Sequence, residues 1–110
     1  MEWKPASLES VRRIVQDDLA RCDGEQGAAF EAYRVDPHLA PIVRYGNLEY
    51  VIIVAQNGKQ VIYWEDVEEG FGVSDVGDDG RILEHDCSQN SLGLALNAWI
   101  EGRRVYGQRK

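Results

Sequence analysis

The dipeptide Asn57-Gly58 lies between two segments rich in Val, Ile and aromatic residues, and it constrains the fold more than any other feature. Asn-Gly is the preferred pair in a two-residue type I′ hairpin turn, because both turn residues need a positive φ. The dipeptide therefore predicts a hairpin between strands 48–56 and 59–66. Counting outward from the turn predicts the pairs Val54 with Val61, Ile53 with Ile62, Ile52 with Tyr63, Val51 with Trp64 and Tyr50 with Glu65.

On this register both faces of the hairpin are apolar. The two faces carry Tyr50, Ile52, Val54, Val61 and Tyr63 on one side, and Val51, Ile53, Ala55, Ile62 and Trp64 on the other. Strands with two apolar faces lie in sheets that are covered on both sides. We therefore expect the hairpin at the centre of the sheet, with Trp64 in the core rather than in a contact surface.

Helical periodicity occurs near both ends of the chain. Apolar residues at helical spacing predict a helix over 7–22, capped by Ser7 and ended by Asp23-Gly24. A shorter helix is expected over 25–34. A last helix is expected over 91–101, with Asn90 or Ser91 as its cap, Gly102 as its end and the apolar stripe Leu92, Ala95, Leu96 and Trp99.

The remaining segments predict further strands and turns. Two prolines predict a loop over 36–41, and strands are expected over 42–45, 71–76 and 81–85. Gly46-Asn47 and the run 77–80 supply the connecting turns. The prediction is a single α+β domain, 1–110, in which an antiparallel meander of about five strands carries N-terminal helices and a C-terminal helix. The basic segment 103–110 is expected to be a flexible tail.

The sequence does not decide which side of the sheet the C-terminal helix covers. If all helices lay on one side, half of the doubly apolar hairpin would be exposed, and a homodimer or a partner site would be expected there.

Several classes are disfavoured. The longest apolar run, Val51–Ala55, is far shorter than the roughly 20 residues of a membrane-spanning helix. The first residues show no secretory signal, so a cytoplasmic location is expected. The two cysteines, Cys22 and Cys87, are interpreted as thiols.

Charge is concentrated in one segment. The whole chain has a net charge of -7, whereas residues 65–86 hold nine acids and one base, Arg81. This segment repels a phosphate backbone and attracts basic proteins, so nucleic-acid binding is not expected. The alternative is that the carboxylates only keep a sheet edge soluble. The predicted partner-binding residues are Glu65, Asp66, Glu68, Glu69, Phe71, Asp75, Asp78 and Asp79.

Metal and catalytic sites are the alternatives to this interpretation. Residues 75–86 imitate a calcium loop, but Gly77 replaces a ligand and Asp86 replaces the bidentate Glu. His85 and Cys87 would need both His38 and Cys22 to complete a zinc site. Adjacent acids on a strand point to opposite faces, so no catalytic pair is evident. A binding protein without cofactor or metal is expected, with a small enzyme or divalent-metal protein using the same carboxylates and His85 as the alternative.

Three segments, 64–71, 79–83 and 92–99, resemble small acidic bacterial immunity proteins of polymorphic toxin systems. The resemblance covers about a third of the chain and transfers no individual binding residue. It implies a non-enzymatic inhibitor of a cognate toxin, often a basic nuclease. A basic protein, such as a toxin, is therefore the expected partner.

Overall fold

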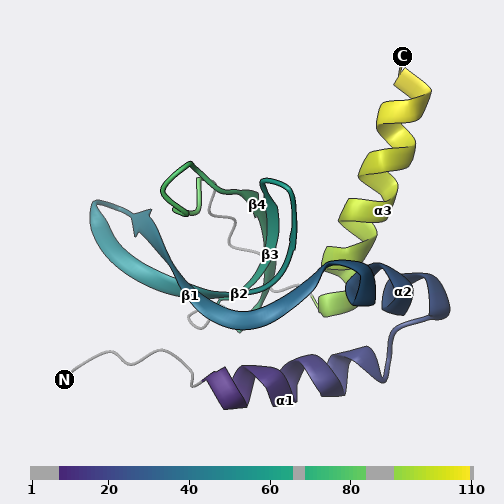
Figure 1. Ribbon diagram of the computed structural model, residues 1–110, viewed down its shortest axis with the longest axis horizontal. Helices are drawn as coiled ribbons and strands as arrows, with labels where there is room; N and C mark the ends of the chain where they lie inside the picture. The colour runs from purple at the N-terminus through teal and green to yellow at the C-terminus, as the bar shows by residue number, and fades with distance from the viewer. Residues whose placement is uncertain (1–7, 66–68, 84–90, 110) are drawn as a thin grey trace.

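The computed structural model describes residues 8–65, 69–83 and 91–109, without the side chains of Arg44 and 101–109. It confirms an α+β domain with N-terminal helices and a C-terminal helix (Figure 1). The elements are α1 (Leu8–Leu19), α2 (Gly24–Tyr33), β1 (Arg34–Arg44), β2 (Asn47–Asn57), β3 (Gln60–Glu65), β4 (Gly70–Asp75) and α3 (Leu92–Arg109). The strands form one antiparallel sheet in the order β1-β2-β3-β4, so the β2–β3 hairpin is central as predicted.

All three helices pack against one face of the sheet, here called the outer face. Its core contains Val11 and Val15 of α1, Phe30 of α2, the sheet residues Ile52, Val54, Ala55, Ile62, Trp64 and Phe71, and the α3 residues Leu92, Ala95, Leu96, Trp99 and Ile100. Aromatic edges meet within it, since Tyr33 packs against Trp99 at 5.8 Å and Trp64 against Phe71 at 5.1 Å between ring centroids. The buried position of Trp64 agrees with the sequence prediction.

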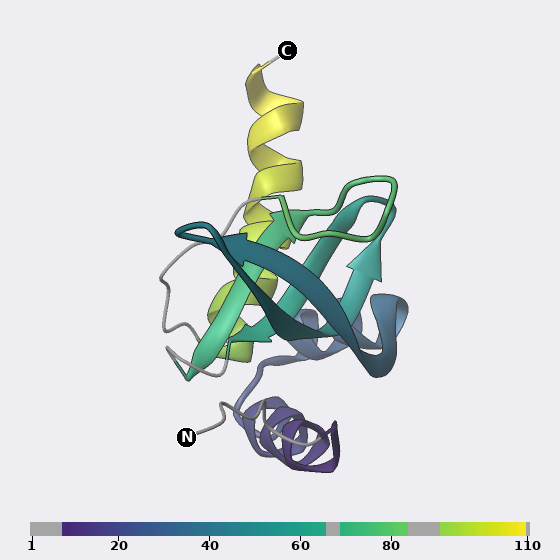
Figure 2. The same ribbon diagram turned by 90° about the vertical axis from the view of Figure 1, so that its left-hand side faces the viewer.

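On the opposite face, here called the inner face, the described covering residues belong to strands and loops instead of a helix. The sheet curls, and the segment after β4 returns across it toward β1 (Figures 1 and 2). Ile82 forms single bridges with Val76 and with Ile42, and its N–H donates to the carbonyl of Pro41 at 2.9 Å. The second core therefore consists of sheet and loop residues: Ala40, Ile42, Val51, Ile53, Val61, Tyr63, Val76 and Ile82.

This closure corrects two expectations. The strand predicted over 81–85 is reduced to the bridges at Ile82 in the described residues, while 84 and 85 lie outside them. Within the described part of the chain the sheet therefore has four strands rather than about five. The helices do all lie on one side of the sheet, but the inner face is not exposed. The curled sheet and Ile82 bury it.

The register of the central hairpin differs from the predicted one. The turn residues are Gly58 and Lys59, and Asn57 pairs with Gln60. Gly58 has φ of 63°, whereas neither Asn57 nor Lys59 has a positive φ. This pattern is that of a type II′ turn with Gly at its first position, not of a type I′ turn.

A bulge changes the register again between Ile53 and Ala55. Both Val54 and Ala55 consequently belong to the outer core. Beyond the bulge, Ile52 pairs with Trp64, so Trp64 shares its face with Ile52 instead of Ile53. A slip of one residue exchanges the two faces of a strand, but here both faces are apolar and both remain buried.

The loop predicted over 36–41 is wrong, because these residues belong to β1. Pro37 and Pro41 fit there since β1 is an edge strand, where a missing N–H does not interrupt a second ladder. The turn into β2 is Tyr45-Gly46 instead of Gly46-Asn47. Both of its residues have positive φ, 52° and 80°, as a type I′ turn requires.

The helix ends also differ from the predictions. α1 ends at Leu19, and Asp23 begins α2 instead of stopping α1. The side chain of Asp23 accepts from the N–H of Gln26 at 2.8 Å, while that of Gln26 accepts from the N–H of Asp23 at 2.9 Å. These two bonds form a capping box.

α3 is tied to the N-terminal helices by polar contacts. Its first N–H, that of Leu92, donates to a carboxylate oxygen of Asp18 at 2.9 Å. Ser91 caps the helix as predicted, accepting from the N–H of Leu94 at 3.2 Å, while Ser7 and Asn90 lie outside the described residues. Gly102 does not end α3, which continues to Arg109 through most of the predicted flexible tail.

One glycine of β4 permits the inner core to close. Gly72 lies opposite Tyr63, and a Cβ added to Gly72 would approach the Tyr63 ring to 2.7 Å. Because Tyr63 is fully buried, its ring has no open space to move into. We predict that Gly72→Ala lowers the free energy of unfolding by about 1–3 kcal/mol, measured by urea denaturation.

Gly27→Ala is the matched control. Gly27 lies within α2, and an added Cβ would meet nothing within 4 Å. The same chemical change should therefore stabilise the protein by up to about 1 kcal/mol through helix propensity. Equal effects of the two substitutions would contradict the assigned packing of Tyr63 on Gly72.

Candidate functional site

The predicted partner-binding residues do not form one surface. Glu65 is only 2 % exposed at the end of β3, and Phe71 is fully buried in the outer core. Neither side chain can therefore form a contact surface, which corrects both assignments. The sequence could not reveal this burial of Glu65. Alternation assigns the side chains of a strand to its two faces, but it does not show what covers each face.

The predicted partner-binding acids that the structure describes as exposed lie at or beyond the two ends of β4. Glu69 precedes the strand, and Asp75 ends it. At the rise of a β-strand these residues are roughly 20 Å apart. Asp78 and Asp79 follow in the next loop, near Asp75, whereas Asp66 and Glu68 lie outside the described residues. The structure thus brings together Asp75, Asp78 and Asp79, here called the acidic loop.

Backbone hydrogen bonds shape the acidic loop. The N–H of Gly77 donates to the carbonyl of Arg81 at 2.9 Å, and the N–H of Gly80 donates to that of Gly77 at 2.9 Å. Gly80 has φ of 83°, which suits a residue without a Cβ. A carboxylate oxygen of Asp79 accepts from the N–H of Arg81 at 3.1 Å. The turn predicted over 77–80 is therefore present.

A groove lies between the acidic loop and β1. Its volume is about 170 Å³. The lining residues are His38, Leu39, Ala40 and Pro41 of β1, Ile53 and Gln56 of β2, and Val76, Asp79 and Gly80. Buried Ala40, Ile53 and Val76 give the groove apolar walls, while exposed His38 and Asp79 provide its more accessible part.

The charges beside the groove are solvated. The side chain of Asp78 is 98 % exposed and lies 3.6 Å from the ammonium of Lys59, which is 78 % exposed. Such an exposed pair contributes little to stability and can exchange partners readily. An apolar channel beside carboxylates suits the side chain of Lys or Arg, whose methylene stem packs on apolar atoms while its charge stays in water.

Sequence reasoning missed the β1 side of this groove. The two prolines predict a loop that contains His38, Leu39 and Pro41. The available signal was the apolar run Leu39–Val43, which continues through Pro41 and is compatible with an edge strand. The contact between this run and Asp79 depends on the curl of the sheet.

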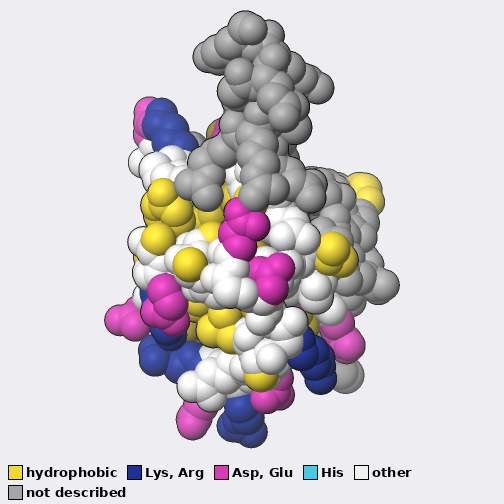
Figure 3. Space-filling view, turned by 90° about the vertical axis from the view of Figure 1, so that its right-hand side faces the viewer, with side chains coloured by type: hydrophobic (Ala, Val, Ile, Leu, Met, Phe, Trp, Pro, Cys, Tyr) yellow, Lys and Arg dark blue, Asp and Glu magenta, His cyan; other side chains and the backbone are white. Residues whose placement is uncertain are grey.

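A second surface consists of exposed apolar side chains on the outer face of the β1–β2 hairpin, beyond the helices. The cross-strand pairs Leu39 with Ile52, Pro41 with Tyr50 and Val43 with Leu48 share this face. Leu39, Val43, Leu48 and Tyr50 are each at least 42 % exposed. On the other end of the molecule, shown in Figure 3, hydrophobic side chains form separate patches among polar and charged ones.

The structure groups no three potential metal ligands among the His, Cys, Asp and Glu residues that it describes. Residues 84–86 of the calcium-like segment, and Cys87, lie outside the described ranges. Cys22 is a free thiol whose Sγ donates to the carbonyl of Asp18 at 3.4 Å. Burial, followed by the nearby charges of Asp18 and Asp23, raises the pKa of this thiol. It is therefore less nucleophilic at neutral pH than an ordinary cysteine.

Comparison with known proteins gives no relative: no protein-family model, curated protein or solved structure matches the chain. Among the described helices, none combines the length and apolar character needed to cross a membrane.

Proposed function

We propose that this chain is a non-catalytic protein-binding module that receives a basic segment of a partner protein in the groove between β1 and the acidic loop. The resemblance to immunity proteins makes a basic toxin the proposed partner and inhibition the proposed outcome. The observation that carries the proposal is that Asp79 lines an apolar groove, with Asp75 and Asp78 in the same acidic loop.

The groove and the acidic loop offer complementary contacts to one kind of side chain. The aliphatic stem of Lys or Arg would pack against Ile53 and Val76, and its charge would lie near Asp79. The exposed carboxylates of Asp75 and Asp78 would add longer-range attraction, which increases the rate of association with a basic surface.

The proposal differs from the sequence hypothesis in its residues. Glu65 and Phe71 are excluded as contacts by their burial, whereas His38 is added from β1. Glu69 lies at the far end of β4 and is not required. A charge-reversal test must therefore change the acidic loop, because a lysine at Glu65 would bury an uncompensated charge and unfold the protein.

The test uses a capped hexapeptide of alternating arginine and leucine, titrated into the ¹⁵N-labelled full chain and followed by NMR. We expect saturable shifts at the amides of 38–40 and 76–80. The double variant Asp75→Lys with Asp78→Lys should weaken binding at least tenfold, because two attractive charges become repulsive. Raising the ionic strength should also weaken binding of the wild type.

The matched control is Glu9→Lys with Asp17→Lys. Both residues are exposed on α1, and the double variant has the same net charge as the acidic-loop variant. We expect it to bind within about twofold of the wild type, since neither residue lines the groove. Equal losses in both variants, or a peptide that shifts no groove amide, would refute the groove as the binding site.

The exposed apolar face of the β1–β2 hairpin supports a homodimer as a second candidate. A two-fold interface uses the same patch on both copies, so an uncharged apolar patch is complementary to itself. Large exposed apolar patches commonly mark such interfaces. The occupant proposed for Leu39, Val43, Leu48 and Tyr50 is therefore a second copy of this chain.

Light scattering at high micromolar concentration tests the homodimer. We predict a dimer for the wild type and a monomer for Leu48→Asp. Leu94→Asp on α3 is the matched control, since Leu94 is 57 % exposed and Leu48 is 60 % exposed. A monomeric wild type, or dissociation by both substitutions alike, would eliminate this face as a dimer interface.

A further inference from the structure

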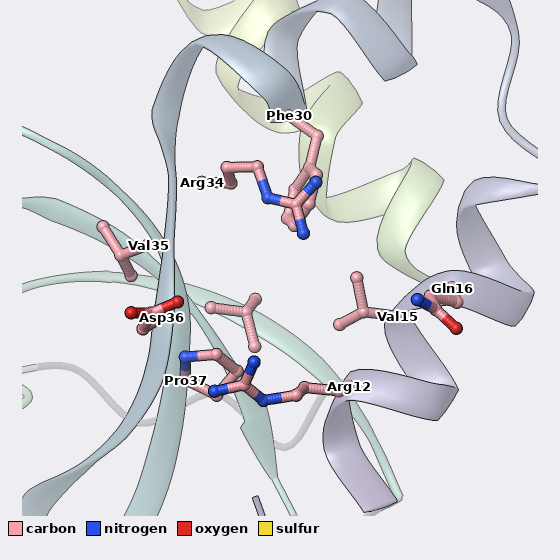
Figure 4. Close-up of a pocket in the computed structure, with 9 residues that line it drawn as sticks. Arg12, Val15, Gln16, Phe30, Arg34, Val35, Asp36 and Pro37 are labelled. Carbon is pink, nitrogen blue, oxygen red and sulfur yellow. The ribbon is translucent and has the colours of Figure 1, made fainter. Parts of the chain in front are cut away.

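A second pocket lies away from the acidic loop, where α1, the end of α2 and the start of β1 meet (Figure 4). Its volume is about 100 Å³. The lining residues are Arg12, Val15 and Gln16 of α1, Phe30 of α2, Arg34, Val35, Asp36 and Pro37 of β1, and Val54 of β2. The pocket thus combines apolar walls with two guanidinium groups from different elements.

The apolar walls are fixed by the outer core. Val15, Phe30 and Val54 are each at most 5 % exposed and belong to that core. An apolar cavity of about 150 Å³ can hold a benzene ring. The smaller volume here suits a short branched alkyl group of about three or four carbon atoms.

Arg34 is held in place at the first of the two cationic positions. It ends α2 and begins β1, where it pairs with Ala55 of β2. Its guanidinium lies 5.3 Å from the centroid of the Phe30 ring, and its Nη1 contacts a carboxylate oxygen of Glu31 at 2.9 Å. Stacking on the ring and this ion pair orient the planar group beside the pocket.

Arg12 provides the second cationic position. Its side chain extends from α1 toward Pro37 on the other side of the pocket (Figure 4). Across the described ranges, its guanidinium has no ion pair with any carboxylate. Among the described residues no carboxylate therefore competes with a ligand for the Arg12 guanidinium, whose donors match the geometry of a carboxylate.

The surrounding acids determine the charge of a suitable ligand. Glu31 is paired with Arg34, and Asp36 lines the pocket without forming an ion pair with Arg12 or Arg34. These two carboxylates reduce the positive potential of the two arginines. A monoanion is consequently favoured over a phosphate dianion.

We propose that this pocket binds a small, branched aliphatic monocarboxylate. Its carboxylate lies between Arg12 and Arg34, and its alkyl group packs against Val15, Phe30 and Val54. The site shares no lining residue with the groove at the acidic loop, so it is independent of the proposed function.

The test titrates isovalerate into the ¹⁵N-labelled full chain, with isovaleramide, acetate and inorganic phosphate as comparison ligands. We expect saturable shifts from isovalerate at the amides of Val15, Phe30 and Val54. Isovaleramide should bind at least tenfold more weakly because it lacks the charge, and acetate because it lacks the alkyl group. Phosphate should not compete at equal concentration.

Arg12→Gln is the decisive variant, because this exposed side chain has no ion pair with a described residue and can be replaced without unfolding the chain. It should weaken isovalerate binding at least tenfold while the melting temperature stays unchanged. Arg13→Gln is the matched control, since Arg13 is also exposed on α1 but does not line the pocket. Absence of isovalerate binding, equally tight binding of phosphate or isovaleramide, or equal losses in Arg12→Gln and Arg13→Gln would overturn the proposal.

Discussion

The need to bury both faces of the β2–β3 hairpin determines the rest of this structure. Residues 51–55 and 61–65 are buried without interruption, although neighbouring side chains of a strand point to opposite faces. The three helices can cover only the outer face. The inner face is therefore buried by the curl of the sheet, and Ile82 completes this closure by bridging the end of β4 to β1. Burial of apolar area drives both steps.

Both proposed ligand sites are consequences of this packing. Because Ile82 is held against Pro41 and Ile42, the acidic loop lies beside β1 and a groove with apolar walls forms next to its carboxylates. Because α1 and the end of α2 pack on the outer face, Arg12 and Arg34 line the same pocket as Val54. The two sites thus have opposite charge preferences on opposite faces of one sheet. The groove suits a basic segment, while the pocket suits a small organic anion.

Much of the fold could be predicted from periodicity, but the site could not. Helical spacing located all three helices, and the apolar runs located the central hairpin. The register was wrong because Asn57-Gly58 satisfies type I′ geometry locally, whereas the chain uses Gly58-Lys59 and a bulge at Val54 to bury both faces. The strand predicted over 42–45 is shorter than β1 because proline signals a break in a sequence, although an edge strand tolerates proline. The charge count shows which segment is acidic, but it does not show which of its acids are accessible. Tertiary packing buries Glu65 and leaves Asp78 exposed.

The closure of the sheet by Ile82 is the central claim, since the groove exists only if the acidic loop is held against β1. Amide hydrogen exchange with NOE spectroscopy on the wild-type chain tests it most directly. The account predicts that the N–H of Ile82, which donates to Pro41 at 2.9 Å, exchanges as slowly as the core amides of β2, and that the methyl groups of Ile42 and Ile82 show an NOE. Rapid exchange at Ile82 without that NOE would show that the loop does not close the sheet, and would contradict the account.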